Sequence, residues 1–192
     1  MFLLSICGEE PRLDTMPVLK TTVYPWTEGS YRPLCYARCA AVPGRGILFD
    51  LQSFLRDPFV GDTGDLLDDS CVAFSFRFFP AQNEDIVTAV LNFRGSYAVF
   101  INGVQAACTF AVTRYAGADE QGWYWGVRFW FTEELLERFC GAREIPDGHR
   151  LAGNLYAFKR AGSDAYMAAV APMAEPFIFS AQNLAPFEAV AY

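Results

Sequence analysis

The chain has 192 residues, a length at which a single domain buries about 70% of the surface that its unfolded form exposes. Hydrophobic residues make up 53% of it and aromatic residues 16%, a composition that excludes a disordered chain. The net charge of -7, from 22 acidic and 15 basic residues, argues against nucleic acid and against a membrane surface as partners, because both attract basic proteins. A neutral ligand or another protein remains.

The first residues, "MFLLSICGEEPRLD", are predicted to form a loose extension. Their apolar run has no basic residue before it and acids soon after it, which is unlike a signal peptide, and the run is too short to span a bilayer. We therefore expect an extension over residues 1–16, a single domain over residues 17–192 and a location in the cytoplasm.

Apolar and polar residues alternate along much of the chain, which predicts strands with one buried face and an all-β protein. In "LLDDSCVAFSFRFFP" every second position from Val72 to Phe78 is apolar, and the strand should end at Pro80, which has no amide hydrogen for a sheet. Residues 54–69, before it, are predicted as a long loop with five aspartates. Other strands are expected over residues 18–24, 34–42, 46–52, 87–93, 122–131, 150–160 and 165–172, with a last edge strand over 187–191.

Two local signals predict a hairpin and a helix. In "YAVFINGVQAACTFAV", Asn102 and Gly103 tolerate the positive φ values of a type I′ turn. In "TEELLERFCG", Thr132 can cap a short helix over residues 132–140 and Gly141 can end it. About ten short strands with one helix favour a single antiparallel β-sandwich of immunoglobulin-like or jelly-roll type.

The six cysteines include no C-x-x-C pair, and His149 is the only histidine, so a zinc site is not expected. Cys71 and Cys108 lie within apolar segments, where unreacted cysteines act as small core residues. Free buried thiols are therefore favoured, with disulfides as the alternative.

Residues suited to catalysis are few. His149 lies in "PDGHR", where a solvated or structural role is favoured over a catalytic one. The carboxylate pairs Asp68-Asp69 and Glu133-Glu134 suit glycoside hydrolysis by residue type, but adjacent residues of a strand point to opposite faces. No glycine-rich phosphate loop or dinucleotide-binding motif is present. We therefore expect no enzymatic activity and no catalytic residues.

The acidic segment "GDTGDLLDD" raises calcium as a hypothesis, because hard cations bind clustered carboxylates and carbonyls. The segment lacks the spacing of an EF-hand loop, so a solvated loop without a metal or cofactor is favoured.

Aromatic residues raise a second hypothesis. An exposed ring can stack on the C–H face of a sugar while the sugar hydroxyls bond to nearby polar groups. Packing in the core or at its rim is the alternative for each ring. The candidates are Tyr24, Trp26, Tyr31, Tyr124, Trp130 and Tyr166.

Five stretches, taken in order, carry a resemblance to a known family. They are "YRPLCYARCAAVPGRGILFDL", "LLDDSCVAFSF", "AVLNFRGSYAVFING", "WGVRFWFTEELLERF" and "DGHRLAGNLYAFKRAGSDAYMAAVAP". Together they resemble the carbohydrate-binding modules of family 9, and in particular a stand-alone bacterial branch described as family 9-like. The resemblance extends from Tyr31 to the end of the chain.

The resemblance implies a β-sandwich that holds a terminal sugar between two tryptophans, with polar residues around its hydroxyls. This chain departs from the pattern: Leu67 and Val170 stand where the family has the tryptophans, and Ala73 stands where it has a glutamate. Leucine and valine lack the ring face that stacks on a pyranose. The ligand residues have diverged, and we expect an altered or lost specificity.

Three residues near the inferred site are expected to bind a ligand: Arg94 and Asp69 as remaining polar groups, and Tyr166 as a replacement ring. A surface role for Arg94 and a turn role for Asp69 are the alternatives. The first functional hypothesis is a non-catalytic module that binds a saccharide or oligosaccharide. The second is a structural or protein-interaction β-sandwich whose sugar site has filled in, with the apolar segment "PFIFSAQNLAPF" against a partner or, in a homodimer, a second copy.

Overall fold

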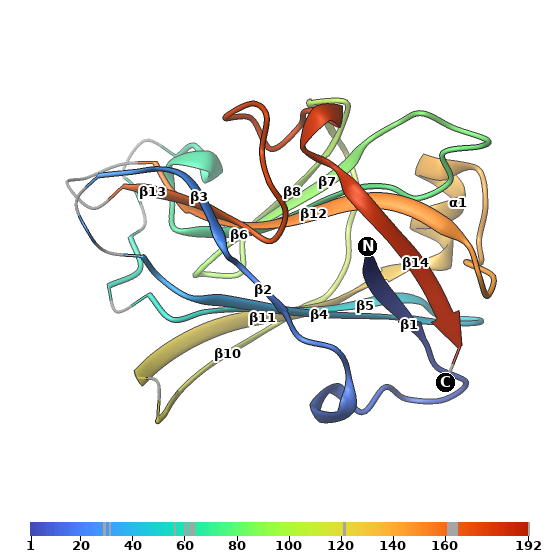
Figure 1. The fold of residues 1–192 in the computed structure, drawn as a ribbon, viewed down its shortest axis with the longest axis horizontal. Helices are drawn as coiled ribbons and strands as arrows, with labels where there is room; N and C mark the ends of the chain where they lie inside the picture. The colour runs from blue at the N-terminus through green and yellow to red at the C-terminus, as the bar shows by residue number, and fades with distance from the viewer. Residues whose placement is uncertain are drawn as a thin grey trace.

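A computed structural model of the chain describes residues 1–28, 30, 32–55, 57–59, 61, 64–120, 122–160 and 165–191. The described residues form fourteen strands, one α-helix and three short 3-10 helices (Figure 1). The strands are β1 (Phe2–Ile6), β2 (Leu19–Lys20), β3 (Val23–Thr27), β4 (Cys35–Val42), β5 (Gly46–Ser53), β6 (Cys71–Arg77), β7 (Val87–Asn92), β8 (Tyr97–Ile101), β9 (Val104–Ala106), β10 (Val112–Asp119), β11 (Gly122–Thr132), β12 (Arg150–Lys159), β13 (Tyr166–Ala169) and β14 (Ala185–Ala191). The helices are α1 (Glu133–Cys140), η1 (Leu13–Thr15), η2 (Leu66–Asp68) and η3 (Ala181–Asn183).

The strands form one continuous mixed sheet. Its order is β10-β11-β5-β4-β1-β14-β12-β6-β7-β8-β9, with β13 between β12 and β3, and with β2 beside β4. β1 runs parallel to β14 and β4, and the other pairs are antiparallel. The sheet curls into a lower layer of β4, β5, β10 and β11 and an upper layer of β6, β7, β8, β12 and β13 (Figure 1).

The all-β class with one short helix is confirmed. The expectation of a purely antiparallel sheet is wrong, because β1 inserts in parallel between β14 and β4. The immunoglobulin-like or jelly-roll type stays a prediction. None of the described helices has the length and apolar character needed to cross a membrane.

Aromatic side chains fill the space between the layers. The ring of Phe49 on β5 stacks on that of Phe74 on β6, with centroids 4.2 Å apart, and lies 5.5 Å from the ring of Phe129 on β11. All three belong to one buried cluster, and Phe74 lies at an inward position that the alternation from Val72 to Phe78 predicts. Full burial of one such side chain stabilises a fold by about 1.5–3 kcal/mol, so this cluster is a main source of stability.

Local sequence signals predict the turns and the helix correctly. Asn102 and Gly103 have φ values of 49° and 80° in the turn between β8 and β9, as a type I′ turn requires. The hydroxyl of Thr132 accepts a hydrogen bond from the amide of Leu135 at the start of α1, and Gly141 ends the helix at a φ of 78°.

The first and last strands, β1 and β14, each have a neighbouring strand on both sides, which differs from the sequence-based expectation. β1 belongs to the segment expected to be a loose extension, yet it lies between β14 and β4, and Leu4 is 2% exposed. β14, expected as an edge strand, lies between β1 and β12. Parallel neighbours come from segments distant in the chain, so no local pattern predicts these two positions.

All six cysteines are free thiols, and four of them are buried. Burial raises the pKa of Cys35 and of Cys39 to about 12, so both remain protonated at neutral pH. These side chains act as small core residues.

Replacing Leu4 by alanine should lower the free energy of unfolding by about 2–5 kcal/mol, because the truncation leaves a cavity in the core. The measurement is urea denaturation. Glu9→Ala, at an exposed position just after β1, is the control and should change stability by less than about 0.5 kcal/mol. An equally small effect of Leu4→Ala would contradict the placement of β1 in the sheet.

Candidate functional site

An apolar groove of about 180 Å³ lies on the upper layer, on the face turned away from the lower layer. Residues from β3, η2, β13, the end of β12 and the segment 176–179 line it. The lining includes Trp26, Leu67, Phe158, Arg160, Met167 and Phe177.

The floor of the groove follows from strand pairing. Phe158 of β12 is paired with Met167 of β13, and Met167 is paired with Trp26 of β3. Paired residues of antiparallel strands present their side chains on the same face, so these three form one apolar row across the strands. Phe158 and Met167 are buried, whereas Trp26 is half-buried and offers part of its ring to solvent.

The segment that carries Phe177 is held in place by buried polar side chains. Asn183, 1% exposed, accepts hydrogen bonds from two amides and donates two to carbonyl oxygens of residues 174–177. The Ser75 hydroxyl donates to the carbonyl of Ile178 at 2.6 Å. Phe177 itself is 64% exposed. A well-anchored segment therefore presents an apolar ring at the groove, with little conformational entropy left to lose on binding.

Polar groups lie at the rim of the groove. Nη1 of Arg160 is 3.9 Å from Oδ1 of Asp68, and both side chains are partly exposed. Asp65 accepts a hydrogen bond from the amide of Leu67 at 2.9 Å and so caps η2. The guanidinium donates and the carboxylate accepts, so the rim offers both partners that a hydroxyl group needs. The arrangement can hold an apolar molecular face and bind hydroxyls at its edge.

Asp69, a predicted ligand residue, lies outside the groove lining and is buried. Its Oδ1 accepts a hydrogen bond from the amide of Gly61 at 2.7 Å, and its Oδ2 accepts one from Nδ2 of Asn92 at 2.7 Å. These bonds join the acidic loop to β7. The turn role that the sequence offered as the alternative agrees with these contacts, while ligand binding by Asp69 stays a prediction.

Arg94 and Tyr166 also lie outside the groove lining. Arg94 is exposed in the turn between β7 and β8, two residues from Asn92, which bonds to Asp69. Tyr166 is 1% exposed, in the cluster between the layers, so its ring presents no face to solvent. The structure places Asp69 and Arg94 at one corner and Tyr166 in the core, and their ligand roles stay predictions.

The three positions where the chain departs from the family pattern lie in different parts of the structure. Leu67 lines the groove, and Ala73 belongs to the buried cluster beneath it. Val170 belongs instead to the cluster between the two layers. The groove therefore contains one of the two aliphatic replacements, and its accessible rings come from positions outside the family motif.

Of the predicted stacking rings, Trp26 alone is among the described residues that line the groove. The hydroxyl of Tyr24 donates to a backbone carbonyl, and the guanidinium of Arg45 covers Trp130 at 4.0 Å from the ring centre. Tyr124 lies on the lower layer, and Tyr31 lies outside the described residues.

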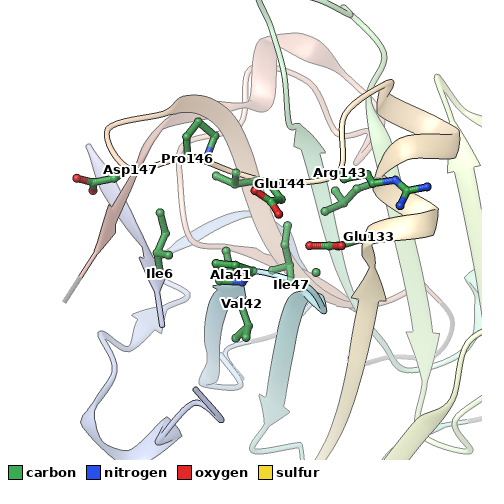
Figure 2. A pocket seen from close by; sticks show the side chains of 13 residues that line it. Ile6, Ala41, Val42, Ile47, Glu133, Arg143, Glu144, Pro146 and Asp147 are labelled. Atoms are coloured by element: carbon green, nitrogen blue, oxygen red, sulfur yellow. The ribbon is translucent and has the colours of Figure 1, made fainter. Parts of the chain in front are cut away.

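A second cavity, of about 150 Å³, lies between α1 and the ends of β1, β4 and β5 (Figure 2). Its floor is apolar, with Ile6 and Ala41, and Figure 2 shows Glu133 and Glu144 on its rim. Glu133 accepts a hydrogen bond from the amide of Gly44 at 2.6 Å. None of the described residues that line this cavity is aromatic, so it offers no stacking surface.

The residues considered for catalysis and metal binding have structural partners. Nε2 of His149 lies 2.7 Å from the carbonyl oxygen of Phe78, and Glu134 accepts a hydrogen bond from the Thr132 hydroxyl. Within the described part of the chain, no three His, Cys, Asp or Glu side chains form a metal-binding group. Asp62 of the acidic loop lies outside the described residues.

No protein-family model matches the chain, and no curated protein matches it significantly. Solved structures match it over nearly its whole length. A candidate carbohydrate-binding protein of Bacteroides uniformis has a TM-score of 0.67 and 16% identity, with 98% of this chain and 99% of that chain covered. A family 9 carbohydrate-binding module of Caldicellulosiruptor kristjanssonii, solved with cellotriose, has a TM-score of 0.70 and 6% identity, with 100% and 94% covered. The glucose complex of a family 9 module from that organism has a TM-score of 0.68 and 6% identity, with 100% and 96% covered. The chain therefore has the fold of family 9 carbohydrate-binding modules, as the resemblance implies.

Asp69→Ala should destabilise the protein by about 1–3 kcal/mol, because it leaves the amide of Gly61 and the side chain of Asn92 without their acceptor. Urea denaturation measures the change. Asp57→Ala, at an exposed position of the same loop, is the matched control and should change stability by less than about 0.5 kcal/mol. An Asp69→Ala protein as stable as the control would show that these bonds contribute little to the fold.

Proposed function

We propose that the chain is a non-catalytic saccharide-binding module and that the groove lined by Trp26 and Phe177 is its binding site. The observation that carries the proposal is the pair of accessible rings beside a buried apolar floor. The fold supports it, because modules of the same fold have been solved with cellotriose and with glucose.

The size of the groove favours a single sugar unit. Its volume of about 180 Å³ lies below the roughly 300–1,000 Å³ of sites for drug-sized ligands. The C–H face of one pyranose would lie on Trp26 or Phe177, and its hydroxyls would bond to Arg160 and Asp68 at the rim. The rest of a longer oligosaccharide would extend beyond the groove.

The proposed specificity differs from that of the family pattern. Leu67 removes one stacking ring from the groove, and Val170 cannot supply another from inside the core. Trp26 and Phe177 lie on segments other than those that carry the family's two tryptophan positions. A sugar held by these rings would therefore lie in a different orientation from a sugar in the family pattern. The proposal does not require ligand contacts from Arg94, Asp69 or Tyr166.

The proposal includes no catalysis. Glycoside hydrolysis uses two carboxyl groups on either side of the scissile bond. None of the described residues that line the groove carries a carboxylate, and at its rim Asp68 pairs with Arg160 while Asp65 caps η2.

A protein-interaction module is the second candidate, and the exposure of Phe177 and Pro176 favours it. Exposed apolar side chains beside an apolar groove mark many protein interfaces. Sedimentation at rising concentration tests its homodimer form. Self-association that Phe177→Ala abolishes, together with no saccharide binding, would favour this candidate, and a monomer throughout would count against the homodimer.

Phe177→Ala should weaken the binding of cellotriose about three- to tenfold, because one stacking ring is lost. Isothermal titration calorimetry measures the dissociation constant. The ring is mostly exposed, so the variant should remain folded. Val104→Ala removes an exposed apolar side chain from the β8–β9 hairpin and should leave binding unchanged. Equal binding by the wild type and by Phe177→Ala would remove this ring from the site, and absence of binding to cellotriose and glucose would leave the proposal without support.

A further inference from the structure

The outer face of the lower layer carries a row of charged side chains. Arg38 on β4 is paired with Asp50 on β5, and Asp50 is paired with Arg128 on β11. Their strand neighbours point into the core, so these three side chains point away from it. In Figure 1 this face is the underside of β4, β5, β10 and β11. It lies on the side of the molecule away from the groove.

The row has more positive than negative charge. Oδ1 of Asp50 accepts hydrogen bonds from the Tyr115 hydroxyl at 2.9 Å and from Nε of Arg128 at 3.1 Å. Nη1 of Arg38 is 4.0 Å from Oδ2 of the same carboxylate, and Nε of Arg38 is buried, with no hydrogen-bond partner among the described residues. Burial and the charge of Asp50 raise the pKa of Tyr115, which remains a neutral donor. One carboxylate thus faces two guanidinium groups.

Rings lie next to this row. The rings of Tyr36, Phe54, Tyr124 and Tyr115 follow one another, with centroid distances of 5.4, 5.5 and 6.4 Å. A Cβ on Gly126 would lie 2.3 Å from the ring of Tyr115, and one on Gly117 would lie 2.7 Å from the hydroxyl oxygen of Tyr124. Each tyrosine ring therefore lies flat over a glycine of the neighbouring strand, so the two rings do not project far from the sheet.

The charges at the ends of the face differ from those in its middle. Lys20 lies over the ring of Tyr36 at 5.4 Å and adds a third cation to the middle. Asp119 lies at one end of the face, where β10 ends. The ion pair of Arg45 with Glu10 lies at the opposite end, where Arg45 covers the ring of Trp130. The middle is therefore cationic, although the whole chain has a net charge of -7.

We propose that this face is a second binding site, and that its ligand is an acidic polysaccharide with uronic acid units. Guanidinium groups bind carboxylates through paired hydrogen bonds, and the partly exposed guanidinium of Arg128 suits them, while Arg38 adds positive charge on the other side of Asp50. The tyrosine rings suit the C–H faces of sugar units. A flat surface across four strands fits an extended polysaccharide better than a compact ligand. This proposal is independent of the groove.

The test is calorimetric titration with trigalacturonic acid and with its methyl ester, which has the same rings without the charges. The wild type should bind the acid about tenfold more tightly than the ester, and added salt should reduce the difference. Arg128→Gln should weaken binding of the acid about tenfold and leave binding of the ester unchanged. Arg143→Gln, which removes an exposed arginine paired with Glu137 near α1, is the control and should have no effect.

A second variant keeps the test decisive if Arg128→Gln perturbs the fold. Tyr124→Ala should weaken binding of the acid and the ester alike, because it removes a stacking ring. Equal affinity for acid and ester, no effect of either variant, or equally tight binding of a short double-stranded DNA would overturn the proposal.

Trp26→Ala separates this site from the groove. It should weaken binding of cellotriose and leave binding of trigalacturonic acid unchanged. Loss of both ligands in this variant would assign the acid to the groove and overturn the proposal. If the wild type binds the acid but not cellotriose, the groove proposal fails and the second site remains.

Discussion

The stacking of Phe49 on Phe74 between the layers is the constraint on which both surfaces depend. Successive side chains of a strand point to opposite faces, so strands whose rings meet in the core must present the intervening residues outside. In the upper layer the outward residues include Phe158, under the groove. In the lower layer they include Asp50 and Arg128. A register shift of one residue would exchange the core with both proposed binding surfaces.

Much of the fold could be predicted because its signals are local. The alternation from Val72 to Phe78 and the turn at Asn102 and Gly103 depend on residues next to one another in the chain. The positions of β1 and β14 could not be predicted in this way. Their pairing joins the two ends of the chain, and a sequence pattern shows that a strand forms but not which strand lies beside it.

The candidate groove could be predicted only in part. Trp26 was among the candidate rings, and Leu67 was singled out by the family resemblance. Phe177 lies in the apolar segment predicted to contact a partner, but it was not among the candidate stacking rings. Its segment is irregular, and its place depends on the buried hydrogen bonds of Asn183, which no spacing in the sequence reveals. Tyr166 shows the opposite problem. An aromatic residue in an alternating strand is compatible with either face, and here the register turns it into the core.

The central claim is that the groove binds a saccharide through its own rings. The most direct measurement is titration of the isotope-labelled protein with cellotriose, observed by NMR at the indole N–H signals of its four tryptophans. Trp26→Phe assigns the signal of Trp26. The account predicts a saturable shift of the Trp26 signal, with the signal of buried Trp125 unmoved. A Trp26 signal that stays in place while cellotriose binds, or the absence of any saturable shift, would contradict it.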